Sequence, residues 1–321
     1  EAEPDNLSIK TLIARFYFES QEVEKSLALI DQMLKQRPGY YPARLLKAEV
    51  LLSQKAFKEV LPLLESLEKD EPSSFVVHYF KGLYLAAHNK TESAKSSIVR
   101  SLELNPRFVK AHLLLSNLFL SEKSYDLALV QAEKLIDISP KHYSARMIRA
   151  EALIGLGKLN QAEKILAGLI NQAPEKVTAY FRMGRLQMMK KQFDKAYEYS
   201  QAAYEKSNQS MKSFLQIVNI LAAKKEYDQA QTFSQQQLAI VGSDIRSQAV
   251  IYRVQAQLYE RQKKNDQAMA LFKKSIEIDP KFADPYYSIA RIYIENGETQ
   301  KAAEQYETIL KINPKSSRPL M

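Results

Sequence analysis

The sequence predicts an all-α protein, an α-solenoid of about nine helix–turn–helix repeats of 34 residues each. Three observations support this fold class. Prolines recur every 34 residues, small residues recur at two fixed places within that interval, and glycine (8) and proline (12) are scarce among 321 residues, which favours helix. Helix pairs repeated at a fixed period bury their apolar faces by stacking on one another, as solenoids do.

The proline interval sets the register of the repeats. It is formed by Pro4, Pro38, Pro72, Pro106, Pro140 and Pro174 and, after a slip of four residues, by Pro280 and Pro314. The two intervening steps fall on Asn208 and Gly242, which also tolerate the end of a helix. Since proline lacks an N–H and clashes with the preceding turn, each proline is expected to end the second helix of its repeat.

Small residues mark the crossing of the two helices in each repeat. With the proline numbered position 32, the repeats begin at Leu7, Tyr41, Phe75, Val109, Tyr143, Val177, Met211, Ala249 and Ala283. Position 8 is small in eight of the nine repeats, and position 20 is alanine in seven. Antiparallel helices approach closely only where facing side chains are small. Val60 and Val218 break this rule, so their repeats are expected to be looser.

A small residue at position 8, alanine at 20, a large residue at 24 and proline at 32 together resemble the tetratricopeptide repeat family. Segments such as AMALFKKSIEIDP and AAEQYETILKINP look like its second helix and terminator. The resemblance covers nearly all of the chain, although tryptophan is absent at position 4 throughout. It implies a right-handed α-solenoid that binds proteins or peptides and carries no catalytic site.

The register divides the chain into five segments. They are residues 1–6 (the tail of a preceding repeat), 7–244 (repeats one to seven), 245–248 (a four-residue insertion), 249–316 (repeats eight and nine) and 317–321 (the start of a further repeat). We expect a piece of a longer array; natural termini are the alternative. The insertion adds about one helical turn, with Asp244 as N-cap. It is either a tolerated insertion or a break in curvature that divides the array.

The resemblance also implies that the first helices line a concave face through positions 2, 5, 9 and 12. The candidate ligand groove comprises Leu45, Glu49, Tyr79, Leu83, Leu113, Asn117, Leu120, Met147, Glu151, Phe181, Arg185, Met188, Leu215 and Asn219. This predicts an apolar groove with a few polar groups, unless tight winding fills it. The carboxylate clamp of one subclass is incomplete, because Leu113 and Leu215 stand where lysine is needed.

No catalytic motif is recognisable in the sequence. Without cysteine there is no thiolate site or disulfide, and no glycine-rich phosphate loop, Gly-x-Ser-x-Gly elbow or H-E-x-x-H helix occurs. His78 and His112 share position 4, an aromatic packing position, so we interpret them as core residues rather than metal ligands. We therefore expect no enzyme, no cofactor and no metal.

Charge and hydropathy bear on the partners. The net charge of +9 is dispersed in short lysine pairs, so nucleic acid is the least favoured partner. No apolar run approaches the roughly 18 residues of a membrane span.

The first interpretation is a scaffold for a protein or peptide. The alternatives are the substrate-recruiting or regulatory arm of a larger enzyme, and a self-assembling scaffold. Similarity to bacterial arrays of exopolysaccharide export would favour the bacterial envelope or periplasm over the cytoplasm.

Overall fold

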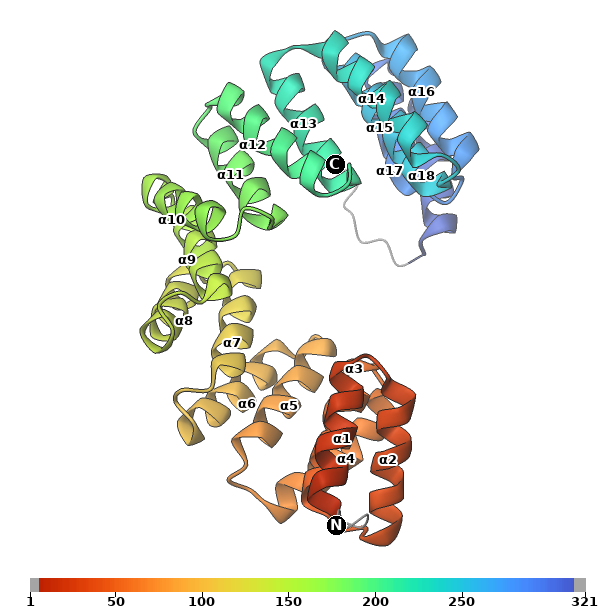
Figure 1. Cartoon of the computed structure of the whole chain (residues 1–321). Helices are drawn as coiled ribbons and strands as arrows, with labels where there is room; N and C mark the ends of the chain where they lie inside the picture. Colours follow the sequence, from red (N-terminus) through yellow and green to blue (C-terminus); the bar gives the residue numbers. More distant parts are fainter. Residues whose placement is uncertain (1–5, 315–321) are drawn as a thin grey trace. The chain divides into compact units, whose positions relative to one another are not determined.

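The computed structural model describes residues 6–314, and in this range the chain is all-helical (Figure 1). The eighteen helices are α1 (Leu7–Glu19), α2 (Val23–Gln36), α3 (Tyr41–Ser53), α4 (Phe57–Asp70), α5 (Phe75–Ala87), α6 (Thr91–Leu104), α7 (Val109–Ser121), α8 (Tyr125–Ile138), α9 (Tyr143–Gly155), α10 (Leu159–Gln172), α11 (Val177–Met189), α12 (Phe193–Lys206), α13 (Met211–Lys224), α14 (Tyr227–Val241), α15 (Ile245–Arg261), α16 (Asn265–Ile278), α17 (Ala283–Glu295) and α18 (Thr299–Ile312). Eighteen helices make nine helix pairs, which confirms the predicted fold class.

The small residues lie at the helix crossings, as predicted. Every residue at positions 8 and 20 is buried, from Ala14 and Ser26 in the first repeat to Ala290 and Ala302 in the last. At Gly82 a Cβ atom would lie 2.5 Å from Cγ1 of Ile98, so this crossing leaves no room for a methyl group. In the two repeats where valine replaces the small residue, the first and second helices (α3–α4 and α13–α14) contact each other less extensively. The comparison is with the two helices of the repeats α1–α2, α5–α6, α7–α8, α11–α12, α15–α16 and α17–α18.

The proline positions end the second helices by two different routes. Before proline the last residue is extended, as at Arg37 (φ −142°, ψ 89°) and Asn105 (φ −141°, ψ 89°), because the proline ring excludes the helical conformation there. Where proline is absent, Asn208 (φ 50°) and Gly242 (φ 54°) adopt positive φ instead. Both routes stop the helix, which confirms the interpretation of these two residues.

The turn inside every repeat contains one residue with positive φ. It is always position 15, and the nine residues are Gln21, Lys55, Asn89, Lys123, Gly157, Lys191, Lys225, Lys263 and Gly297. Glycine is the usual choice for this conformation because it has no Cβ. Seven of these nine turns nevertheless use a residue with a side chain, most often lysine.

The four extra residues before Ala249 lengthen α15 at its N-terminus. The Asp244 carboxylate accepts hydrogen bonds from the backbone N–H groups of Arg246 (3.1 Å) and Ser247 (3.3 Å), which confirms it as the N-cap. The Ser247 hydroxyl donates to the other carboxylate oxygen at 2.6 Å. The insertion is therefore absorbed as one additional helical turn.

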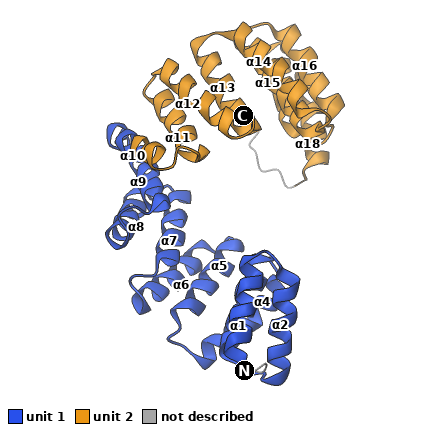
Figure 2. Cartoon of the chain, viewed as in Figure 1, with its two compact units in different colours: residues 1–165 blue, residues 166–321 orange. Residues whose placement is uncertain are grey.

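The helices form two compact units, residues 1–165 and 166–321, with the boundary inside α10 (Figure 2). In the first unit, buried clusters form where each second helix meets the next first helix. Ile30 and Met33 of α2 pack with Ala43 and Leu46 of α3 in this way. In the second unit the largest of the described clusters joins α12, α13, α14 and α15.

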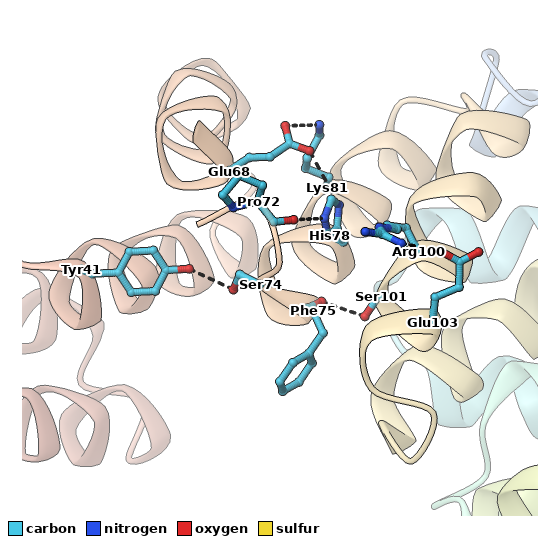
Figure 3. Close-up of polar contacts among 10 residues, drawn as sticks. All are labelled: Tyr41, Glu68, Pro72, Ser74, Phe75, His78, Lys81, Arg100, Ser101 and Glu103. Carbon is cyan, nitrogen blue, oxygen red and sulfur yellow. Dashed lines mark hydrogen bonds and ion pairs between the residues drawn. The ribbon is translucent and has the colours of Figure 1, made fainter. Parts of the chain in front are cut away.

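Polar contacts tie neighbouring repeats together in the first unit (Figure 3). His78 Nε2, in the third repeat, lies 2.9 Å from the Pro72 carbonyl oxygen of the second repeat. The Tyr41 hydroxyl donates at 2.9 Å to Oγ of Ser74, the last residue of its own repeat and the N-cap of α5. Within one repeat, the Ser101 hydroxyl donates to the Phe75 carbonyl oxygen at 2.7 Å. Ser275 makes the same bond to Ala249 in the second unit, also at 2.7 Å. Positions 1 and 27 are thus linked in both places.

Helix α1 exposes a stripe of large apolar residues. Ile9, Leu12, Ile13 and Phe16 are 46%, 67%, 41% and 64% exposed. Their spacing places them on one helix face. In α3 the equivalent face is buried against α2. Among the described residues, no second helix covers the stripe of α1 in this way.

Candidate ligand-binding surface

The fourteen predicted groove residues lie on six first helices, α3, α5, α7 and α9 in the first unit and α11 and α13 in the second. None of them is fully buried. The apolar members are half-buried, while Asn117, Arg185 and Asn219 are exposed. Half-buried apolar side chains form a surface that still has area to offer a ligand.

In the first unit, a pocket of about 520 Å³ brings three of these residues together. Glu49, Tyr79 and Leu83 line it with Leu52, Phe80 and Ala87 of the same two helices. Phe18, Phe57, Ser53, Lys55 and Lys110 complete the lining. The floor is therefore aliphatic and aromatic, and the charged groups stand at its edge.

Glu49 is the acidic residue among those that line this pocket. Its carboxylate lies 3.0 Å from the Arg15 guanidinium of α1 and 3.5 Å from the Lys110 ammonium of α7. Burial, and secondly the negative charge of Glu49, raise the pKa of the Tyr79 phenol above its ordinary value. Tyr79 is therefore a neutral hydrogen-bonding group, and the charge of Glu49 is compensated from both sides.

Six predicted residues line none of the described pockets. Leu45 packs against the core of its own repeat. Leu113, Asn117 and Leu120 lie on α7, and Met147 and Glu151 lie on α9. They are accessible, and none of them lines one of the four described pockets.

In the second unit, a pocket of about 310 Å³ joins the remaining five predicted residues. They are Phe181, Arg185, Met188, Leu215 and Asn219, and Lys212 and Gln216 complete the lining. The Lys212 ammonium lies 4.2 Å from the centroid of the Phe181 ring, a cation–π contact. The Gln216 amide donates to the Phe181 carbonyl oxygen at 3.0 Å and so links α13 to α11.

A second pocket of about 220 Å³ adjoins this one and shares Leu215 and Asn219 with it. Its other lining residues are Val218, Ala222, Arg253, Val254, Gln257, Leu258 and Arg261. The two cavities together span α11, α13 and α15. We call them the unit 2 groove.

Sequence reasoning missed several of these lining residues. Lys110 and Lys212 occupy position 2, which the family resemblance had indicated as a groove position. Arg253 and Gln257 occupy positions 5 and 9 of the eighth repeat. Continuing the same register past the four-residue slip would have identified Arg253 and Gln257. Phe18 occupies position 12 of the first repeat and could have been found in the same way. Phe57 occupies position 17, which is not a groove position, and no signal in the sequence marks it.

Among residues 6–314 no group of three or more His, Asp or Glu side chains is placed to hold a metal ion. His112 is buried, with its two ring nitrogens 2.9 Å from the Pro106 carbonyl oxygen and 3.0 Å from Gln131 Oε1. It is therefore a core residue. No helix in the described part of the chain is long and apolar enough to cross a membrane.

Three family models described as tetratricopeptide repeat match the sequence. They match residues 119–186 and 260–320, residues 209–281, and residues 79–143, so that together they extend over more than half of the chain.

Two curated relatives are versions of one protein. The chain is 31% identical over 107 residues to anaphase-promoting complex subunit 7 of Homo sapiens, covering 33% of this chain and 19% of that protein. It is 25% identical over 206 residues to the subunit from Dictyostelium discoideum, covering 62% of this chain and 29% of that protein. The chain thus spans less than a third of the length of either relative.

The fold is similar to solved structures across most of the chain. The apo form of RapI matches with a TM-score of 0.67 and 14% identity, covering 97% of this chain and 98% of RapI. A tetratricopeptide repeat protein from Parabacteroides merdae matches with a TM-score of 0.59 and 15% identity, covering 79% of this chain and 98% of that protein. At such identities the likeness shows the fold alone.

Proposed function

Because the chain belongs to the tetratricopeptide repeat family, we propose that it is a scaffold that binds peptide or protein segments through the first-helix surface of each unit. The observation that carries this proposal is a pocket of the same design in each unit. Both pockets are built from positions 5, 9 and 12 of neighbouring first helices, and both have an apolar floor edged by charged groups.

The apolar floor supplies the affinity. Each CH₂ group transferred from water into such a pocket contributes about 0.8 kcal/mol, so a leucine-sized anchor contributes about 1.5–3 kcal/mol. The pocket of about 520 Å³ in the first unit is large enough to take one or two side chains of that size. The charged edge then selects among the segments that carry such anchors.

The known relatives support a role in protein interaction but do not specify the partner. The name of the curated relative describes a subunit of a complex, which is consistent with a chain that assembles with other proteins. The fold of this family is typically non-catalytic, and the three family models that match the sequence are all described as tetratricopeptide repeat. The names of these relatives give no support to an exopolysaccharide-export or envelope context, and the proposal does not include one.

The test is a selection from a random peptide display library with paired variants. Leu83→Glu and Phe181→Glu place a charge on the two pocket floors. Val130→Glu and Ile240→Glu place the same charge on second helices, at side chains that are 46% and 45% exposed. Circular dichroism establishes that all four variants remain helical.

We expect peptides selected on the wild type to lose about 10- to 100-fold in affinity for the matching pocket variant, the equivalent of one lost apolar anchor. The second-helix variants should bind them as the wild type does. Peptides that bind all five proteins equally would show that the first-helix pockets are not the site.

Self-association is a second candidate function, favoured by the exposed stripe of α1. Four neighbouring large apolar residues form a patch of the kind that protein contacts cover. In this alternative, one molecule docks on another through that face. It is independent of the pockets, because the residues of the α1 stripe line neither of them.

A further inference from the structure

The unit 2 groove is lined by positive charge without any negative charge. Arg185 of α11, Lys212 of α13, and Arg253 and Arg261 of α15 all line its two cavities. No aspartate or glutamate is among the lining residues. Between the cations lie apolar side chains, including Phe181 and Leu215.

None of these four cations forms an ion pair in the described part of the chain, since no carboxylate oxygen lies 4.0 Å or less from its nitrogen atoms. Other cations of the same unit do have one. The Lys224 ammonium lies 2.9 Å from Asp194 and 2.8 Å from Glu226. Arg246 lies 2.7 Å from Asp279, and Arg291 lies 2.6 Å from Glu260. Cations left without counter-ions are therefore gathered in the groove.

Arg253 is the most enclosed of the four. Burial lowers the pKa of its guanidinium, and although Asp284 opposes this effect, it does not reach ion-pair distance. Nη1 donates to Gln257 Oε1 at 3.0 Å, while Nε is buried and has no acceptor. The guanidinium carbon lies 5.6 Å from the centroid of the Phe282 ring. The charge is thus held in place but is not neutralised by its surroundings.

We propose that the unit 2 groove binds an extended acidic segment of another protein, in which Asp or Glu side chains flank an apolar side chain. This inference rests on the scaffold function proposed above and names the class of its ligand. Carboxylates would pair with Arg185, Lys212 and Arg253, and the apolar side chain would enter between Phe181 and Leu215. The Asn219 amide, which makes no hydrogen bond with another described residue, is placed to bind the ligand backbone between the two cavities.

The spread of the cations favours side-chain carboxylates over a single chain terminus. Packed helices lie about 8–10 Å apart, so cations on three successive first helices extend over roughly 16–20 Å. One carboxylate reaches donors within about 3 Å. An extended segment advances about 3.3 Å per residue, so about six residues would cover the distance.

The lining favours a peptide over single-stranded nucleic acid. Nucleic-acid grooves combine cations with aromatic platforms on which successive bases stack. Phe181 is the aromatic residue among the groove-lining residues, and Lys212 already lies over its ring at 4.2 Å. The other apolar lining residues are aliphatic, which suits aliphatic side chains.

The probe is a fluorescently labelled peptide of about twelve residues, twice the length that the groove requires. It has glutamate at most positions and leucine at every third. Matched peptides carry glutamine in place of glutamate, or serine in place of leucine. A fourth peptide keeps the glutamates and leucines but has an amidated C-terminus. Binding is measured by fluorescence anisotropy at low and at physiological salt.

The variant protein carries Arg185→Glu and Lys212→Glu, both at exposed positions. The matched control carries Lys195→Glu and Lys273→Glu, which are also exposed but lie on the second helices α12 and α16. Both double variants have the same net charge. Non-specific attraction to a basic protein would therefore be weakened equally in the two.

We expect the glutamate–leucine peptide to bind the wild type and the control alike, and to lose about tenfold or more with the groove variant, as two weak ion pairs would predict. The glutamine and serine peptides should also bind more weakly, and amidation should change nothing.

Three results would overturn the inference: equal binding of the glutamine peptide, equal weakening in both double variants, or displacement of the peptide by single-stranded DNA at a lower concentration than by unlabelled peptide. Loss on amidation would likewise reject side-chain recognition in favour of a terminal carboxylate. None of these results would contradict the scaffold function itself, because that proposal is tested by the peptide display selection.

Discussion

The Nε2 atom of His78 lies 2.9 Å from the carbonyl oxygen of Pro72, the proline at position 32 of the preceding repeat (Figure 3). His112 makes the same contact with Pro106 at 2.9 Å. In the ninth repeat the Tyr286 hydroxyl donates to Pro280 at 3.2 Å. A polar ring at position 4 therefore ties the start of a first helix to the proline turn before it. These prolines lie beyond the last residue of the second helix, so their carbonyl groups take no part in the hydrogen bonds within that helix.

Replacing His78 by phenylalanine should destabilise the protein by about 0.5–1.5 kcal/mol, because the ring is kept and the hydrogen bond is lost. His78→Tyr should retain most of the stability, since Tyr286 makes the equivalent bond in its own repeat. Urea unfolding followed by circular dichroism measures both. Equal midpoints for the phenylalanine and tyrosine variants would show that the bond contributes nothing.

Lys55 adopts φ 57°, one of the seven positive-φ turn residues that are not glycine. Lys55→Gly should stabilise the protein by about 0.5–1 kcal/mol, because glycine adopts this conformation without the cost of a Cβ. The neighbouring Gln54 has φ −83°, so Gln54→Gly is a matched control that should destabilise instead. The two thermal unfolding temperatures should therefore move in opposite directions. A shift of the same sign in both variants would contradict this account of the turn.

The Asp244 cap should make stability depend on pH. Hydrogen bonds from the Ser247 hydroxyl and then from its backbone N–H lower the pKa of this carboxyl below its ordinary value. A lowered folded-state pKa means that the contribution is fully present above the unfolded pKa of about 3.9 and is lost as pH falls through the folded value.

Asp244→Ala should therefore be less stable than the wild type at neutral pH, and the difference should shrink as the pH falls below about 4. Asp244→Asn keeps an acceptor at the cap but cannot titrate, which isolates the contribution of the charge. Unfolding curves recorded at several pH values give the free energy of unfolding of the wild type and the two variants. A difference between the alanine variant and the wild type that does not change with pH would mean that the charge of Asp244 adds nothing to the cap.

The exposed stripe of α1 should govern any self-association. Leu12→Glu with Phe16→Glu alters side chains that are 67% and 64% exposed, so the fold should tolerate both. We expect any concentration-dependent rise in mass, measured by light scattering, to disappear in this variant. Leu127→Glu with Val99→Glu is the control, at 51% and 42% exposure on second helices. Association that persists in the α1 variant would place the contact elsewhere.

The sequence determined the repeating parts of this protein. The prolines and the small residues at Ala48 or Ala94 specify helix ends and crossings through local geometry and sterics, which act within one repeat. For the same reason, Asp244 could be recognised as a cap from its position alone. The sequence also grouped Phe181, Arg185 and Leu215, which line one pocket, because they stand at fixed positions of the repeat.

The tertiary structure decided the charge balance of the surface and the conformation of the turns. Glu49 is compensated by Arg15 and Lys110, whereas Arg185 and Lys212 face no carboxylate among the described residues. Such pairing depends on side chains from different repeats, brought within about 4 Å by the stacking of helices. The positive φ of Lys55 was hidden as well, because the two helices packed on either side impose it on a residue that does not favour it. A periodic sequence pattern specifies what each repeat does by itself, while the charge balance of the surface arises between repeats.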